Sequence, residues 1–353
     1  MKIDDNFYMK LAIDEAWKYQ LLTYPNPAVG CVIVKNGKLL AIEAHKEAGM
    51  PHAEVNALKE AFLKENPKSV ISTLKTSQEI HKFLIENHND FFNDCEVFVT
   101  LEPCNHIGKT PACANLLKIL KPARVIISVK DPNKTASGGI ETLLTENIDI
   151  TLGVLENDGY KLLLPFISWQ NKTCIFFKMA QTLNGSVDGK ISSNRALAYV
   201  HTLRDKIDLL AIGGNSVRID KPTLDSRYIQ GNNPDIFIYS KNKVFDNNIP
   251  LFKIPHRKVL ISDDLYKLLD YKFIMIEGVY NLLDKLKERI DFFILIISPK
   301  IRKGQNALNE IDGVVAKVTL KSNSAEVSYD REINEADLKN AVKKAGYEVT
   351  GIS

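Results

Sequence analysis

Three residues that can bind zinc stand far apart in this sequence, so any fold of the chain has to bring them together. His52 opens the segment His52-Ala-Glu54, Cys104 follows Pro103, and Cys113 comes nine residues after Cys104. One imidazole and two thiolates leave the fourth tetrahedral position of a zinc ion to water, whose pKa the metal lowers toward neutrality. Glu54 then remains as a carboxylate that can shuttle protons. The sequence therefore predicts a catalytic zinc centre.

The sequence predicts a helix start at His52 and another just before Cys113. Apolar residues recur at helical spacing after His52, at Val55, Leu58, Phe62 and Leu63, which places His52 and Glu54 on one helix. Thr110 and Pro111 predict a second helix start, with Thr110 as N-cap and Pro111 as the first helical residue. Cys113 then lies in the first turn, where the helix N-terminus favours the thiolate that zinc requires.

The spacing of the two cysteines narrows the class of zinc protein. His-x-Glu followed by Pro-Cys-x-x-Cys is typical of zinc deaminases of nucleobases, in which the glutamate is the general acid and base. Here eight residues, 105–112, separate the cysteines, which argues against a nucleic-acid base deaminase. A structural zinc site remains an alternative, and it would need a fourth protein ligand such as His106.

Four segments of the first half resemble the bifunctional riboflavin-biosynthesis deaminase/reductases. They are Pro25-Asn-Pro-Ala-Val-Gly30, residues 45–54, residues 100–113 and Asp131-Pro-Asn133. The resemblance implies a cytidine-deaminase-like domain that removes the 2-amino group of a diaminopyrimidinone ribosylamino phosphate. It also implies a second, dihydrofolate-reductase-like domain that reduces the ribosyl group to ribityl with NADPH. The cofactors expected are therefore Zn²⁺ and NADPH.

Four residues of the first half are predicted to hold the phosphorylated pyrimidine beside the zinc: Asn26, His45, His106 and Lys109. His106 and Lys109 fall in the loop that the long cysteine spacing creates. They can therefore face a phosphate while the flanking thiolates hold the metal.

The second half continues the resemblance in two segments, Lys178-Met-Ala-Gln-Thr-Leu-Asn-Gly185 and residues 213–227. Carried over position by position, it implies NADPH contacts for Ala180, Ser216, Asp220 and Ser240, and substrate contacts for Arg204, Leu224, Arg227 and Glu277. Guanidinium groups suit a phosphate because they make bidentate charged hydrogen bonds, although a surface ion pair is the other interpretation of both arginines.

This half also departs from the family pattern. Asn184 replaces an aspartate, the chain between Gly185 and Ala196 is shorter than usual, and Glu277-Gly-Val-Tyr280 lacks a second glycine. A deaminase whose carboxyl half is only a binding or dimerisation module is therefore the alternative to a bifunctional enzyme.

Length and periodicity predict two α/β domains, residues 1–150 and 151–353. In the first, a helix over about residues 5–21 precedes a hairpin that turns at Asn36-Gly37, and strands at residues 96–101, 124–130 and 149–154 alternate with helices in a layered sheet. The segment between Leu63 and Asp94 is expected to be a surface helical insertion. In the second domain, strands at residues 173–180, 209–212, 236–240, 259–262 and 292–297 predict a doubly wound sheet, with ligands at its carboxyl edge near Gly213-Gly214.

Composition adds expectations about the setting of the protein. A formal net charge of +3 does not suggest a nucleic-acid surface, and no apolar run is long enough to span a membrane. Five cysteines fit a reducing compartment, with Cys31 and Cys174 as buried strand thiols and Cys95 as an ordinary residue before a strand. We expect a cytoplasmic homo-oligomer.

Overall fold

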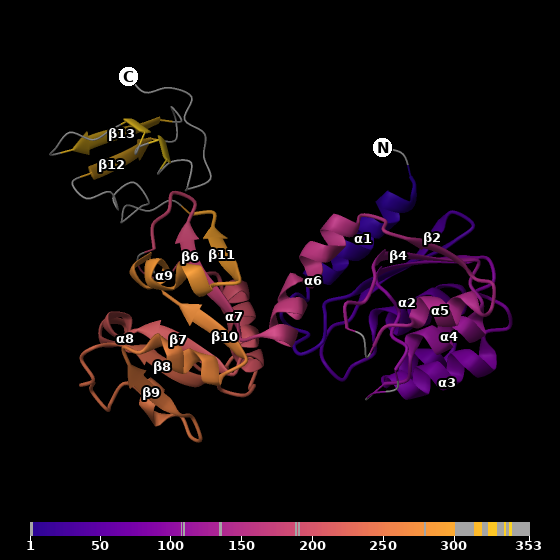
Figure 1. Ribbon diagram of the computed structural model, residues 1–353, viewed down its shortest axis with the longest axis horizontal. Helices are drawn as coiled ribbons and strands as arrows, with labels where there is room; N and C mark the ends of the chain where they lie inside the picture. Colours follow the sequence, from indigo (N-terminus) through magenta and orange to yellow (C-terminus); the bar gives the residue numbers. More distant parts are fainter. Residues whose placement is uncertain are drawn as a thin grey trace. The chain divides into compact units, whose positions relative to one another are not determined.

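The computed structural model describes residues 3–106, 108, 110–133, 136–187, 189, 191–278, 280–300, 314–319, 324–329, 335–336 and 339–340. The chain divides into two compact units, Met1–Lys172 and Thr173–Ser353. Each unit has its own sheet, and Figure 1 draws them in indigo to magenta and in pink to yellow. Within the described part of the chain, no helix combines the length and the hydrophobicity needed to cross a bilayer.

The first unit is built on a five-stranded sheet in the order β2-β1-β3-β4-β5. Strand β1 pairs antiparallel with β2 and β3, whereas β3, β4 and β5 run parallel. The strands are β1 (Gly30–Lys35), β2 (Lys38–Ala44), β3 (Cys95–Leu101), β4 (Arg124–Val129) and β5 (Asp149–Leu152). The predicted turn at Asn36-Gly37 joins β1 to β2, and both residues have the positive φ that such a turn requires.

Helices cover both faces of this sheet. They are α1 (Asp5–Trp17), α2 (Ala53–Glu65), α3 (Ser77–Asn87), α4 (Cys113–Leu120), α5 (Gly139–Leu144) and α6 (Glu156–Asn171). Cys31 and Ile33 of β1 pack on one side with α2, α3 and α4, while Val32 and Val34 pack on the other with α1. This alternation is the period of two that a strand imposes.

The segment predicted as a surface helical insertion does form a helix, α3, preceded by the 3₁₀ turn η1 (Val70–Thr73). It is more than a surface addition, because Ile71, Ile80, Leu84 and Phe92 are buried in the core of the first unit. Cys95 also differs from the expectation, since it begins β3 and is fully buried.

The division between the units lies after Lys172, whereas the sequence placed it at residue 150. Helix α6 accounts for the difference, because it packs on α1 and β4 of the first unit. Its Leu162 carbonyl accepts a hydrogen bond of 2.6 Å from the Gln20 side chain, and the Trp169 indole donates one of 3.0 Å to the carbonyl of Pro25. Residues 151–172 therefore belong with the first unit.

The second unit contains a six-stranded parallel sheet in the order β11-β6-β10-β7-β8-β9. Its strands are β6 (Cys174–Thr182), β7 (Leu209–Gly213), β8 (Asp235–Tyr239), β9 (Val259–Ser262), β10 (Phe273–Glu277) and β11 (Phe292–Ser298). From β6 the chain adds β7, β8 and β9 in one direction and then returns to place β10 and β11 on either side of β6, and such a reversal is typical of a doubly wound sheet. Strand β10, which the sequence analysis did not identify, lies in the middle between β6 and β7.

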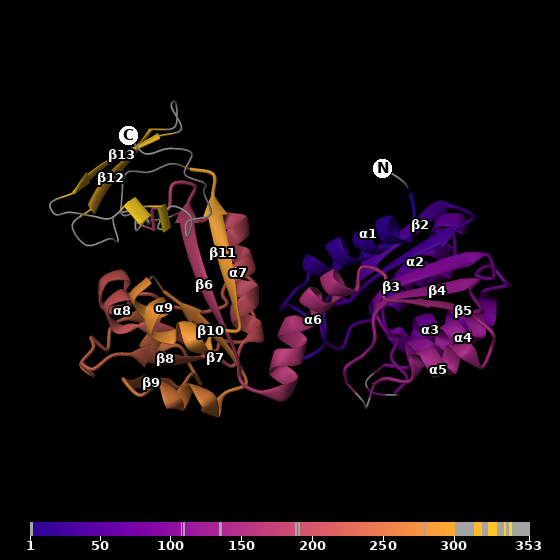
Figure 2. The ribbon, with the colours of Figure 1, turned by 45° about the horizontal axis from the view of Figure 1, so that its top comes forward.

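Helices α7 (Asn194–Lys206), α8 (Gly214–Asp220) and α9 (Tyr280–Leu286) accompany this sheet, with 3₁₀ turns at Pro250–Lys253, Leu265–Asp270 and Lys287–Arg289. Figure 2 shows α7 on the opposite side of β6 from α9. A separate antiparallel pair, β12 (Val314–Thr319) and β13 (Ser324–Tyr329), completes the described elements.

Candidate metal centre and active site

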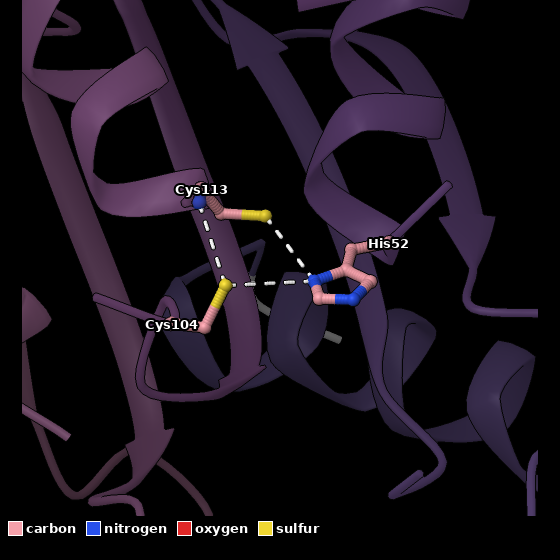
Figure 3. A group of neighbouring side chains, drawn as sticks. All are labelled: His52, Cys104 and Cys113. Atoms are coloured by element: carbon pink, nitrogen blue, oxygen red, sulfur yellow. Dashed lines mark hydrogen bonds between the residues drawn. The ribbon is translucent and has the colours of Figure 1, made fainter. Parts of the chain in front are cut away.

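The three predicted zinc ligands meet in the first unit, and each comes from the end of an element. His52 is the N-cap of α2, Cys104 lies in the loop after β3, and Cys113 is the first residue of α4. Figure 3 shows the sulfur atoms of both cysteines directed at one ring nitrogen of His52. The prediction that His52 and Glu54 share a helix start is confirmed, because Glu54 lies in the first turn of α2.

The distances among these atoms fit a tetrahedral zinc ion. His52 Nδ1 lies 3.6 Å from Cys104 Sγ and 3.5 Å from Cys113 Sγ, and all three ligand atoms lie within 4.8 Å of one another. Zn–N bonds of about 2.0 Å and Zn–S bonds of about 2.3 Å at tetrahedral angles put nitrogen and sulfur about 3.6 Å apart. The donor set and its spacing therefore match zinc.

Among the residues that the structure describes, this group contains no fourth histidine, cysteine or acidic ligand. His106, the residue considered as a fourth ligand, is described and does not belong to the group. Three protein ligands leave a position for water, which is the arrangement of catalytic zinc sites.

Backbone and hydroxyl groups hold the ligands in place. The backbone N–H of Cys113, at the N-terminus of α4, donates to Cys104 Sγ at 3.4 Å. Hydrogen bonds from the Cys113 side chain and from His52 lower the pKa of the Cys104 thiol to about 4. The first turn of α4 thus stabilises the thiolate of the other cysteine.

Thr110 has a different role from the predicted one. Helix α4 begins at Cys113 with Ala112 as its N-cap, so Thr110 is not the cap and Pro111 is not the first helical residue. The Thr110 hydroxyl instead lies 3.3 Å from His52 Nε2. A Nε2–H donated to this oxygen leaves the Nδ1 lone pair for the metal, and partners of this kind orient metal-binding histidines.

Glu54 lies beside the ligands and is almost completely buried, with 4% of its surface exposed. Burial raises the pKa of its carboxyl group to about 7, and the negative charge of Cys104 acts in the same direction. A carboxyl group with a pKa near neutrality can both accept and return a proton at physiological pH. These properties suit the proton shuttle that the sequence predicts.

Asn26 and His45 also come together next to the ligands. His45 Nε2 lies 3.1 Å from the Asn26 side-chain nitrogen, and His45 Nδ1 lies 3.1 Å from the carbonyl of Pro51. Burial lowers the pKa of His45 to about 4, so its ring is neutral and can donate from Nδ1 while accepting at Nε2. The rings of His45 and His52 are 5.2 Å apart.

The other two predicted substrate contacts, His106 and Lys109, belong to the segment between Cys104 and Cys113. His106 is exposed in the loop after Cys104. Lys109 lies outside the described residues.

The sequence analysis missed one acidic residue of this region. Glu102 directly follows β3, is 2% exposed, and accepts hydrogen bonds from the backbone N–H groups of Asp131, Gly138 and Ile140. Its sequence signal was its position within Leu101-Glu-Pro-Cys104, next to a ligand.

The predicted cofactor residues of the second unit gather at the carboxyl edge of its parallel sheet. Ala180 lies near the end of β6, Ser216 and Asp220 are in α8 directly after β7, and Ser240 follows β8. A Cβ on Gly214 would lie 2.7 Å from the Cβ of Ser240, so this close approach requires glycine. The edge is thus the ligand-binding position expected for a doubly wound sheet.

Two of the predicted substrate residues, Arg204 and Glu277, form an ion pair at the same edge. Arg204 of α7 donates to both carboxylate oxygens of Glu277, which ends β10, at 2.9 and 3.1 Å. Lys178 of β6 lies 3.8 Å from the same carboxylate. These cations hold the pKa of Glu277 below its usual value even though burial acts in the opposite direction.

Arg227 and Leu224 lie on the segment after α8. Arg227 donates to Asp225 at 2.8 Å and is largely exposed, whereas Leu224 is buried with a φ of 56°. Each of the two predicted phosphate arginines, Arg204 and Arg227, therefore has a carboxylate partner in this structure.

Known proteins match both units. Residues 2–129 match the family model of the cytidine and deoxycytidylate deaminase zinc-binding region. The chain is 35% identical over 237 residues to riboflavin biosynthesis protein RibD of Aquifex aeolicus, covering 65% of this chain and 59% of the relative. It is 33% identical over 279 residues to RibD of Buchnera aphidicola, covering 76% of this chain and 63% of that relative. The chain thus spans about six tenths of the length of these relatives.

A crystal structure from Thermotoga maritima resembles the whole fold. That protein is a diaminohydroxyphosphoribosylaminopyrimidine deaminase/5-amino-6-(5-phosphoribosylamino)uracil reductase, and it matches with a TM-score of 0.60 and 25% identity. The match covers 92% of this chain and 97% of the other, so it includes both units. By sequence and by fold, the chain is similar to the bifunctional riboflavin-biosynthesis deaminase/reductases.

Proposed function

We propose that the first unit is a hydrolytic deaminase that removes the 2-amino group of a diaminopyrimidinone ribosylamino phosphate. The single observation that carries the proposal is the spacing of His52, Cys104 and Cys113 around one point, with the Glu54 carboxyl buried beside it. Zinc, when bound, supplies an activated water as the nucleophile. The similarity to the riboflavin-biosynthesis deaminase/reductases supports the choice of substrate.

The side chains divide the work of the reaction. Glu54 accepts a proton from the attacking water and delivers it to the departing amino group, which leaves as ammonia while the ring carbon becomes a carbonyl. The Asn26–His45 pair presents hydrogen-bonding groups to the pyrimidine, and the loop with His106 and Lys109 receives the phosphate. His52, Cys104 and Cys113 hold the metal.

Replacing Glu54 with glutamine tests the proton shuttle. Glutamine has nearly the same shape but cannot accept and return the proton, so ammonia release is expected to fall by roughly 10²–10⁴-fold. Zinc content, measured by atomic emission, is expected to stay at one ion per chain. Ammonia release near the wild-type rate would exclude Glu54 from this role.

Replacing Lys109 with alanine tests the phosphate contact. Losing a charge that binds the phosphate is expected to raise KM for the phosphorylated substrate by about tenfold or more, with a smaller effect on kcat. Steady-state kinetics with the phosphorylated substrate measure both constants. An unchanged KM would return Lys109 to an ordinary loop residue.

We propose further that the second unit binds NADPH and reduces the ribosyl group of the deaminated product to ribityl. The carboxyl edge with Gly214, Ser216 and Ser240 is proposed for NADPH, with Ala180 and Asp220 at its margin. The cluster of Arg204, Glu277, Leu224 and Arg227 is proposed for the substrate. Coverage of both units by the Thermotoga maritima enzyme favours a reductase over a binding module.

We also propose that the protein is cytoplasmic and forms a homo-oligomer. All five cysteines are free, which supports a reducing compartment such as the cytoplasm. Edge strand β11 exposes Phe293, Leu295 and Ile297, which supports a homo-oligomer that covers this face. Cell fractionation and light scattering test these two proposals, and a monomer at working concentration would exclude the second.

A further inference from the structure

The Glu102 carboxylate accepts hydrogen bonds from three backbone N–H groups, one after β4 and two at the start of α5. Its Oε2 accepts from Asp131 at 3.1 Å, and its Oε1 accepts from Gly138 at 2.9 Å and from Ile140 at 3.2 Å. Asp131 follows β4, and Gly138 and Ile140 lie at the start of α5. One buried carboxylate therefore holds both ends of the segment between β4 and α5, and we call its described residues, 131–133 and 136–138, the β4–α5 loop.

The β4–α5 loop is also attached to the segment that carries the zinc ligand Cys104. The backbone N–H of Asn105 donates to the carbonyl of Ala136 at 2.9 Å, and the Thr142 hydroxyl donates to the Asn105 side chain at 3.0 Å. A Cβ on Gly139 would lie 1.9 Å from the carbonyl oxygen of Pro103, so α5 and this segment are in direct contact.

The electrostatic surroundings of Asp131 agree with this contact between the loop and the segment that carries Cys104. Burial, together with the nearby charges of Glu102 and Cys104, raises the pKa of Asp131 to about 6, while His106 acts in the opposite direction. The hydrogen bond from Asn105 to Ala136, and the 3.2 Å between a Cβ built on Gly138 and Asn105 Nδ2, place the loop against the residue between Cys104 and His106.

We propose that Glu102 is a positioning residue for the deamination, acting through the β4–α5 loop on the Cys104–His106 segment. The substrate part of this inference rests on the proposed function. Glu102 itself does not contact the metal or the substrate. Its carboxylate holds the β4–α5 loop against the Cys104–His106 segment, which is proposed to contact the metal and the substrate.

The chemistry of the three contacts requires a carboxylate. All three partners are N–H donors, and a carboxylate offers only acceptors. A glutamine in this place would direct its own NH₂ group at one or more of the donors. At least one buried N–H group would then lose its acceptor, at a cost of about 1–3 kcal/mol.

The test compares Glu102→Gln with Glu96→Gln in the full chain. Glu96 lies on β3, the strand that Glu102 directly follows, but it pairs with the partly exposed Arg124, which makes it a matched control. We expect backbone amide exchange in residues 131–140 of Glu102→Gln to quicken by about tenfold or more, with exchange in β1 unchanged. We also expect KM to rise by about tenfold, kcat to change by less than about threefold, and zinc content to stay constant. The control should leave all four measurements unchanged.

Several results would overturn the proposal. Unchanged exchange in residues 131–140 would mean that Glu102 does not hold the loop, and faster exchange throughout the first unit would make it a general stability residue. Faster loop exchange with an unchanged KM would remove the loop from substrate binding. The exchange measurement does not need activity, so a failure of the proposed deamination would be seen separately in the wild-type protein.

A second variant keeps the test decisive if Glu102→Gln does not fold. Thr142→Val removes the hydrogen bond to Asn105 from the other side of the same contact. It is expected to raise KM by about two- to fivefold without lowering zinc content. An unchanged KM in a folded Thr142→Val protein would contradict the proposal.

Discussion

Both ring nitrogens of His52 are used, and this decides which tautomer the ligand adopts. Nδ1 faces the two sulfur atoms, and Nε2 faces the hydroxyl of Thr110. The hydroxyl oxygen can accept only if Nε2 carries the proton, which leaves the Nδ1 lone pair for zinc. With zinc on Nδ1, the Thr110 hydroxyl is thus placed to accept the remaining ring proton and to orient the imidazole.

Replacing Thr110 with valine is expected to weaken zinc binding by about 10–100-fold, because valine keeps the shape of threonine and removes the acceptor for Nε2–H. Competition with a chelator of known affinity measures the change. Thr110→Ser keeps the hydroxyl and is expected to bind zinc within about threefold of the wild type. Equal affinity of the valine and serine variants would contradict the role of the hydroxyl.

The zinc ligands could be predicted from the sequence because each stands in a short motif whose residue types already specify the chemistry. The role of Thr110 could not, because a threonine before a proline signals an N-cap equally well, and only the late start of α4 decides between the two. The ion pair between Arg204 and Glu277 was also hidden, because the two residues stand 73 positions apart in the sequence and meet only in the folded chain.

At the scale of elements, the segment between α8 and β8 depends on one half-buried cation. Arg257 donates to the carbonyls of Thr223, Leu224 and Pro234, and these bonds hold Leu224 in its left-handed conformation. Burial lowers the pKa of Arg257 to about 10. Three charged hydrogen bonds offset the cost of that burial.

Replacing Arg257 with methionine is expected to lower the free energy of unfolding of the second unit by about 2–4 kcal/mol, because three buried carbonyls lose their donor. Urea denaturation that follows the second unit measures this change. The control is Arg227→Met, which removes an exposed arginine and is expected to cost less than about 1 kcal/mol. A loss below about 1 kcal/mol for Arg257→Met would show that the carbonyls find other donors.

The alternation of strands and helices was predictable because buried strands and helix faces leave clear periods in the sequence. The residues at which helices and strands begin and end were less predictable from the sequence. Helix α1 stops at Trp17, four residues before the predicted end, and Leu21 adopts a φ of 69° that no helix continues through. Strand β10 was missed because its five residues, Phe273–Glu277, are too short to distinguish from part of a helix by hydrophobicity alone.

At the scale of the whole molecule, the chain combines two units with different chemistry. The first holds a His-Cys-Cys centre with a buried glutamate, and the second presents glycines and a charged cluster at the carboxyl edge of a parallel sheet. The order of the two reactions follows from the proposal, because the second unit is expected to reduce what the first has deaminated.

The most direct test supplies the purified protein with the diaminopyrimidinone ribosylamino phosphate, first alone and then with NADPH, and follows ammonia release and NADPH oxidation separately. We predict ammonia release without NADPH, and NADPH oxidation only after deamination or when the deaminated compound is supplied. Glu54→Gln should release ammonia roughly 10²–10⁴-fold more slowly yet still oxidise NADPH with the deaminated compound. Absence of ammonia release from the zinc-loaded wild-type protein would contradict the central claim, and absence of NADPH oxidation with a folded second unit would assign the reduction to another protein.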